Sequence, residues 1–181
     1  MQTLPSYLDM LERHYLVCSV PGWAPPARSP KRVRTKPKRY LADPSLAVAA
    51  LGMSPDSLIS DWQAFGSVFE NLCMRDLEVY ARSIPGSALE PVRYYRDDSG
   101  LEVDAVIELD DGRWAAIEVK VSEDKVQDGV SSLKRLRKKL CANAAARTRE
   151  PEFMMVLVGI SEYAREAEEG IYVVPVRALG K

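Results

Sequence analysis

The chain contains 181 residues, of which 46% are hydrophobic and 28% are charged, a composition typical of one soluble globular domain or one domain with an appendage. The net charge of −1 gives no general attraction to nucleic acid or membrane, so any such attraction has to be local. The sequence has no signal peptide and no apolar run long enough to span a bilayer, so we expect a cytoplasmic protein without a membrane partner.

The cysteines and the histidine argue against several kinds of chemistry. Cys18, Cys73 and Cys141 are far apart and odd in number, which argues against a disulfide framework and a zinc cluster. His14 is the only histidine in the sequence, which argues against a histidine base and a Ser-His-Asp triad. Carboxylates and lysines therefore have to carry out any chemistry of this chain.

The N-terminal part is predicted to be a helix followed by two strands. Leucines recur with helical spacing over residues 3–13, and residues 15–20 and 37–42 have the composition of strands. A proline-rich loop over residues 21–30 leads into a basic stretch, residues 28–39, with seven Lys or Arg among twelve residues and no acid.

The basic stretch has two interpretations. Its cations contact phosphates in a salt-dependent way, or the stretch is a flexible solvated loop that keeps the protein soluble. Its prolines and its lack of interleaved aromatic residues favour flexibility. The first interpretation assigns nucleic-acid contacts to Arg32, Arg34, Lys36 and Lys38.

Three helices are predicted next. The first covers residues 45–51, Ser54 caps the second, and the third is long and amphipathic over residues 61–82. Glu70 lies in the middle of the long helix, at the edge of its apolar stripe and one turn after Gly66. A glycine inside a helix costs about 1 kcal/mol relative to alanine, so Gly66 indicates that a packed strand or a substrate approaches the helix closely.

Three strands are predicted after the long helix. Residues 89–96 are typical of an edge strand, because Pro91 lies near the start. Residues 100–121 show two alternating apolar and polar halves, separated by the turn signal Asp110-Asp111-Gly112. This pattern predicts a β-hairpin with one apolar face and one face of functional groups.

The predicted hairpin brings Asp104 near Glu118 and Lys120 on one face. A solvated face explains such groups equally well, because antiparallel sheets often face water on one side. Apolar residues flank Glu118-Val119-Lys120, as in a central strand, and this favours a functional site. In addition, Asp followed by a turn and Glu-x-Lys is a known layout of divalent-metal sites that cut phosphodiesters.

The C-terminal third predicts a helix and two strands. Residues 123–143 form an amphipathic helix, residues 153–160 a strand buried on both faces, residues 161–169 a short acidic loop or helix, and residues 171–176 a last strand. A three-strand meander, a crossover helix and further strands give an α/β (α+β) fold with a mixed central sheet flanked by helices.

The helix over residues 123–143 has five cations among six residues in its C-terminal half. The helix dipole accounts for some of these charges. The alternative is a DNA-binding face that includes Lys134, Arg137 and Lys138.

Asp104 followed by Glu118-Val119-Lys120 resembles the signature of the PD-(D/E)XK nuclease superfamily. More narrowly, the chain is similar, from about Leu4 to its end, to the C-terminal domain of a large group of prokaryotic AAA-type ATPases. The segments that carry this narrower resemblance are residues 38–46, 65–72, 100–104 and 117–120. The chain has no G-x-x-x-x-G-K-[ST] loop, so it does not bind nucleotide in that way.

The resemblance implies a restriction-endonuclease-like core over residues 45–181 and a partial winged-helix-like segment over residues 1–44. Where the superfamily often has proline before the aspartate, this chain has Val103, and that departure removes no ligand.

The resemblance also implies a Mg²⁺ or Mn²⁺ site that cleaves DNA or RNA, with DNA favoured. Asp104 and Glu118 would bind the ion with the Val119 carbonyl, and Glu70 would bind it directly or through water. Lys120 would position the attacking water and offset developing negative charge. Glu70, Asp104, Glu118 and Lys120 therefore form the predicted catalytic set. A second copy of the chain or a separate ATPase component are further expected partners.

Two other interpretations remain. The chain is a non-catalytic interaction or recognition module, derived from an AAA-type ATPase and with a vestigial nuclease fold, or it is a structural domain whose polar sheet face is solvated.

Overall fold

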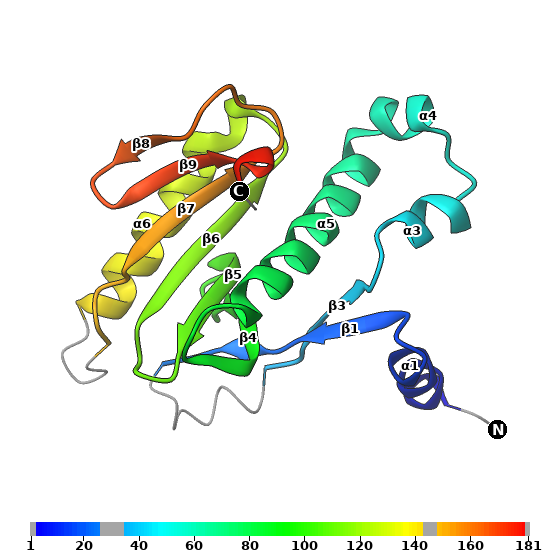
Figure 1. The fold of residues 1–181 in the computed structure, drawn as a ribbon, viewed down its shortest axis with the longest axis horizontal. Coiled ribbons are helices and arrows are strands. Elements are labelled where there is room, and N and C mark those ends of the chain that lie inside the picture. The colour runs from blue at the N-terminus through cyan, green and yellow to red at the C-terminus, as the bar shows by residue number, and fades with distance from the viewer. Residues whose placement is uncertain (1–2, 26–34, 143–147, 180–181) are drawn as a thin grey trace.

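A mixed β-sheet with one long helix on each face forms the centre of the molecule (Figure 1). The structure is a computed structural model and describes residues 3–25, 35–142 and 148–179. The elements in chain order are α1 (Leu4–Arg13), β1 (Val17–Val20), β2 (Gly22–Trp23), β3 (Lys38–Leu41), α3 (Ser45–Ala50), α4 (Pro55–Ser60), α5 (Trp62–Arg82), β4 (Ser87–Arg96), β5 (Glu102–Leu109), β6 (Trp114–Lys120), α6 (Val126–Cys141), β7 (Phe153–Val158), β8 (Arg165–Glu168) and β9 (Ile171–Pro175).

Among the described residues, seven strands form the central sheet in the order β2-β4-β5-β6-β7-β9-β8. Strands β4, β5 and β6 are an antiparallel meander, and α6 is the crossover that places β7 parallel to β6. Strand β9 is parallel to β7, and β8 returns antiparallel to β9. The predicted mixed sheet with flanking helices is therefore confirmed.

Helices α5 and α6 cover opposite faces of the sheet. Ala116 of β6 packs in the core under α6, whereas its neighbour Ile117 packs in the core under α5. The apolar face of α6 is buried, and it is formed by Val126, Val130, Leu133, Leu136 and Leu140. Nearly all of β7 is buried as well. Strand β6 is therefore a central strand with both faces covered, as its flanking residues predicted.

Three predictions about the strands are wrong: the edge position of residues 89–96, the loop over residues 21–30, and the loop or helix over residues 161–169. Strand β4 is not an edge strand, because Gly22 and Trp23 of the predicted proline-rich loop pair beside it as β2. Trp23 is buried against Trp114 and Tyr95, and this packing holds the short strand in place. The predicted loop or helix over residues 161–169 contains strand β8, which pairs with β9 across a turn at Gly170.

The N-terminal segment forms a second, two-stranded sheet. Strands β1 and β3 pair antiparallel, with Val17 opposite Leu41 and Val20 opposite Lys38, and α1 precedes them. The helix and the two strands agree with the predicted elements, while the winged-helix interpretation stays a prediction. None of the described helices is long and apolar enough to cross a bilayer.

Candidate functional site

Asp104 lies where the regular pairing of β5 is interrupted. The register between β5 and β4 shifts around this residue, and the pairing of β5 with β6 ends at Ala105 opposite Ile117. Beyond that point, Asp104 Oδ2 accepts a hydrogen bond from the backbone N–H of Val119 at 2.9 Å. A side-chain carboxylate thus continues the contact between the two strands, as β-bulges next to functional sites often allow.

The bulge also breaks the predicted alternation of β5. Val103 and Val106 both pack in the core under α6, whereas Ala105 packs in the core under α5. Strict alternation would place Val103 and Ala105 on the same face. Asp104 therefore lies near Glu118 and Lys120 because β5 and β6 separate at this point. The predicted arrangement, in which all three side chains lie on one face of a regular hairpin, is not the one observed.

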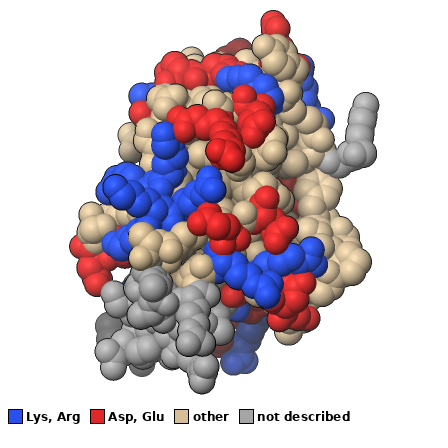
Figure 2. All heavy atoms as spheres, turned by 90° about the vertical axis from the view of Figure 1, so that its left-hand side faces the viewer, with Lys and Arg blue, Asp and Glu red and all other residues tan. Residues whose placement is uncertain are grey.

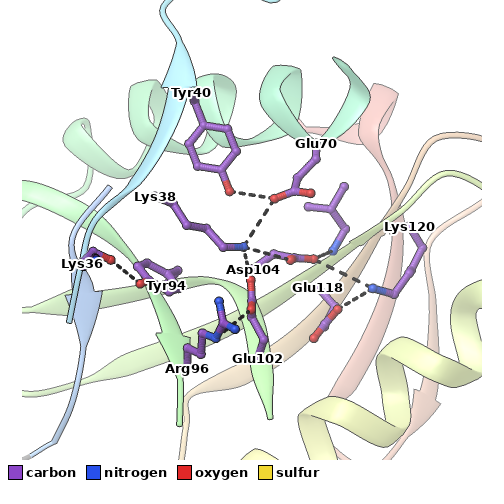
Figure 3. Close-up of polar contacts among 11 residues, drawn as sticks. Lys36, Lys38, Tyr40, Glu70, Tyr94, Arg96, Glu102, Asp104, Glu118 and Lys120 are labelled. Atoms are coloured by element: carbon purple, nitrogen blue, oxygen red, sulfur yellow. Dashed lines mark hydrogen bonds and ion pairs between the residues drawn. The ribbon is translucent and has the colours of Figure 1, made fainter. Parts of the chain in front are cut away.

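Glu118 and Lys120 lie at the C-terminal end of β6. Glu118 is buried with 3% of its surface exposed, and it accepts a hydrogen bond from Lys120 Nζ at 2.5 Å. Lys120 Nζ is also 3.9 Å from Asp104 Oδ2, so this ammonium lies between the two carboxylates. The structure brings together three of the four residues of the predicted catalytic set here (Figure 3).

Glu70 faces this group from α5 and is joined to it by residues of β3. The Tyr40 hydroxyl donates a hydrogen bond to Glu70 Oε1 at 2.7 Å, and Lys38 Nζ lies 3.6 Å from the same oxygen. Lys38 Nζ also lies 2.5 Å from Glu102 Oε1 and 3.8 Å from Asp104 Oδ1 (Figure 3). The Lys38 ammonium is therefore surrounded by carboxylates from α5 and β5.

Burial and charge set the protonation of the site. Burial raises the pKa of Glu118 to about 8, and the Asp104 charge adds to this shift while Lys120 opposes it. Burial by itself would lower the pKa of Lys120 and of Lys38, but the neighbouring carboxylates outweigh it and raise both pKa values. Both ammonium groups therefore stay charged at neutral pH, and Glu118 is the group that titrates near it.

An open hollow of about 690 Å³ adjoins the site between α5 and the end of β6. Glu70 and Lys120 line it together with Gly66. A Cβ added to Gly66 would meet only Val121 at 3.9 Å, which is an ordinary contact. The packed-strand explanation of this glycine is therefore wrong, and the substrate explanation stays a prediction.

The carboxylate oxygens of the site are suitable ligands for a hard divalent cation. In this structure the same carboxylates face the ammonium groups of Lys38 and Lys120. Within the described residues, no three His, Cys, Asp or Glu side chains are placed to hold a metal ion. Asp104 and Glu118 supply carboxylate oxygens, which Mg²⁺ and Mn²⁺ prefer. The Lys120 carbonyl accepts from Gly159 on the β7 side, so the Val119 carbonyl points to the opposite side, toward Asp104.

Four basic residues were predicted to contact nucleic acid from the N-terminal stretch. Arg32 and Arg34 lie outside the described residues. Lys36 has an exposed side chain, and its carbonyl accepts a hydrogen bond from a tyrosine of β4. Lys38 points into the carboxylate group instead of toward solvent, with 23% of its side chain exposed.

The predicted basic face of α6 is largely paired within the chain. Lys134 lies 2.7 Å from Glu168 and Arg137 lies 2.7 Å from Glu150, while Lys138 is exposed on the helix surface. Figure 2 shows basic and acidic side chains next to one another on this side of the molecule. Nucleic-acid contact through these residues stays a prediction.

Lys38, Tyr40 and Glu102 belong to the site and were absent from the predicted catalytic set. One signal was available, because period two in a strand over residues 37–42 puts Lys38 and Tyr40 on the same face. The long sequence separation from Asp104 and the surrounding basic stretch made Lys38 look like a surface cation.

Residues 65–179 match a protein family described as a domain of unknown function (DUF4143), and the chain belongs to this family. The domain is found in AAA-ATPase-associated proteins, which agrees at that level with the predicted resemblance. Residues 1–57 match a second family, also described as a domain of unknown function (DUF8612). No curated protein matches the chain.

One similar solved structure is an assembly of Thermococcus gammatolerans McrB AAA+ hexamers with bound McrC. The match has 12% sequence identity and a TM-score of 0.38, and it covers 94% of this chain and 59% of that chain. The chain thus spans less than two thirds of the matched chain, and the TM-score is too low to establish a shared fold. Membership of the PD-(D/E)XK superfamily stays a prediction.

Proposed function

We propose that this chain is a divalent-metal-dependent hydrolase of nucleic-acid phosphodiester bonds, with DNA favoured over RNA. The observation that carries the proposal is the meeting of Asp104, Glu118 and Lys120 at the open end of the β5–β6 hairpin, with Glu70 opposite them on α5. The hollow beside these residues is open to solvent and offers room for a phosphodiester backbone.

In this proposal Asp104, Glu118 and the Val119 carbonyl hold Mg²⁺ or Mn²⁺, and Glu70 binds the ion directly or through water. Such an ion would lower the pKa of a bound water molecule and would stabilise negative charge on the phosphate. Lys120 is already held by Glu118 at 2.5 Å, so it is fixed in place to orient the water and to offset the developing charge.

Calorimetric titration with Mn²⁺ and with Mg²⁺ tests the ion site. The native protein should bind the ion, and both Asp104→Ala and Glu118→Ala should lose the binding. Lys120→Met should keep the binding but lose nicking of supercoiled plasmid DNA by at least about 100-fold, because it removes only the charge that assists the reaction.

The matched control is Arg82→Ala, which removes a cation from the exposed end of α5, where it pairs with Glu78 far from the site. This variant should bind the ion and nick DNA like the native protein, and EDTA should stop both. Failure of the native protein to bind either ion would contradict the proposal.

A non-catalytic interaction or recognition module is the second candidate. One observation favours it: the Lys38 ammonium already neutralises part of the carboxylate group without any metal. For such a module, neither ion should bind to the native protein, and the native protein should leave plasmid DNA intact, as Asp104→Ala should.

A further inference from the structure

The main chain of β3 is fixed on both sides of Lys38. On one side, the Tyr94 hydroxyl donates a hydrogen bond to the carbonyl of Lys36. On the other side, the Asn71 side chain accepts from the Leu41 N–H at 2.9 Å and donates to the Leu41 carbonyl at 2.8 Å. The Lys38 head group also lies 5.3 Å from the centre of the Tyr94 ring, within cation–π range. Lys38 is therefore a built part of the site and not a mobile surface lysine.

Asp104 is shared between two cationic groups. Its Oδ1 lies 3.8 Å from Lys38 Nζ, which also faces Glu70 and Glu102, and its Oδ2 lies on the side of Lys120 and Glu118. Sites that use two metal ions place them about 3.5–4 Å apart around shared oxygen ligands. In this site, Lys38 lies beside Oδ1 among three carboxylates, and Lys120, the lysine of the Glu-x-Lys pair, lies beside Oδ2.

The formal charges of the site also favour one divalent cation instead of two. With Glu118 deprotonated, as binding of a metal ion requires, the carboxylates of Glu70, Glu102, Asp104 and Glu118 face the ammonium groups of Lys38 and Lys120, which leaves a surplus of two negative charges. Arg96 approaches Glu102 at 3.6 Å, but its side chain is 64% exposed and its effect is screened by solvent. One divalent cation balances this surplus, whereas two would leave the site positively charged.

We propose that Lys38 is a built-in second cation, so that the site takes one divalent metal ion instead of two. This inference rests on the proposed function. The ion binds on the Glu118 side of Asp104, and the Lys38 ammonium holds Glu70 and Glu102 and adds a fixed positive charge for a substrate phosphate.

The test is the number of Mn²⁺ ions bound by calorimetry. The native protein should bind one ion, and Lys38→Met should bind two, because the substitution frees three neighbouring carboxylates for a second ion. Lys38→Arg keeps the charge and should bind one. Lys36→Met is the matched control, two residues away with an exposed side chain, and should also bind one with unchanged affinity.

Electron paramagnetic resonance of the native protein with excess Mn²⁺ is a second readout that needs no variant to fold. It should show one isolated ion, and a spin-coupled pair of ions would overturn the proposal. One ion in Lys38→Met would also overturn it, whether the affinity is unchanged or raised. The same holds if the native protein binds none and Lys38→Met binds one, because Lys38 would then block the only ion position.

The two proposals fail in different ways. The expected ion numbers without DNA nicking would keep Lys38 as the second cation and contradict the hydrolase. One ion in the native protein and in Lys38→Met, with DNA nicking that depends on Lys120, would keep the hydrolase and contradict the role of Lys38. Absence of ion binding in every variant would contradict both.

Discussion

The Asp104 carboxylate and the main-chain N–H of Val119 are joined by a hydrogen bond of 2.9 Å at the point where β5 and β6 separate. Val119 is buried, so removal of the carboxylate would leave its N–H without a hydrogen-bond partner. Asp104 therefore has a structural task in addition to the chemical one proposed for it, and substitutions can separate the two.

Asp104→Asn should keep the fold and lose the metal ion. The asparagine keeps an acceptor oxygen for the Val119 N–H, so its free energy of unfolding should stay within about 1 kcal/mol of the native value. Asp104→Ala leaves that N–H unsatisfied and should lower the free energy of unfolding by about 1–3 kcal/mol. Urea unfolding of both variants without metal checks this, and equal losses would show that the hydrogen bond contributes nothing.

Asn71→Ala should release β3 from α5. Asn71 is buried and makes two hydrogen bonds to the main chain of Leu41, so its removal should cost about 2 kcal/mol of stability. Hydrogen exchange should become faster over residues 38–41, and Lys38 should lose its fixed place. Gln63→Ala, on the exposed surface of the same helix, is the control and should change neither quantity.

The stability of the metal-free protein should fall as the pH rises from about 5 to 9. Burial raises the pKa of Glu118 to about 8, so the folded state favours the protonated form. The stabilisation is complete below the ordinary glutamate pKa of about 4.3 and is lost as the pH rises through about 8. Thermal unfolding across this range should show the decline, and Glu118→Gln should remove most of it. A native profile that rises toward pH 9 would contradict the assignment.

Two glycines near the site should respond differently to alanine. A Cβ at Gly159 would lie 2.8 Å from the Val121 carbonyl oxygen and 3.1 Å from the Phe69 ring, so Gly159→Ala should cost about 1–3 kcal/mol. Gly66→Ala has room on its helix and should stabilise the protein by up to about 1 kcal/mol. Thermal unfolding distinguishes the two. If the hollow holds the substrate, Gly66→Ala should also weaken DNA binding.

The hairpin and its functional groups were predictable because local patterns determine them. Alternation identified β5 and β6, and Glu118 and Lys120 are two residues apart on one strand, so any regular strand puts them on one side. The bulge at Asp104 was not predictable, because it depends on how β4 and β6 pair with β5 and not on the residues of β5 alone.

The remaining errors share a cause. Strand β8 has the sequence Arg-Glu-Ala-Glu, which has little strand propensity, and only its pairing with β9 makes it a strand. Charged residues are common on edge strands, where they discourage pairing with other chains. The position of Lys38 in the site also depends on distant contacts, because its partners Glu70 and Asp104 are more than thirty residues away in the sequence. A local sequence pattern does not predict such contacts.

The attachment of β3 to α5 and β4 has a consequence for dividing this protein into parts. Lys38 and Tyr40 precede Phe65, where the DUF4143 match begins, yet both complete the surroundings of Glu70. A fragment that starts at Phe65 would carry the four carboxylates and Lys120 but would lack Lys38. Replacing the N-terminal segment would therefore change the charge around Glu70 even if residues 65–179 were left intact.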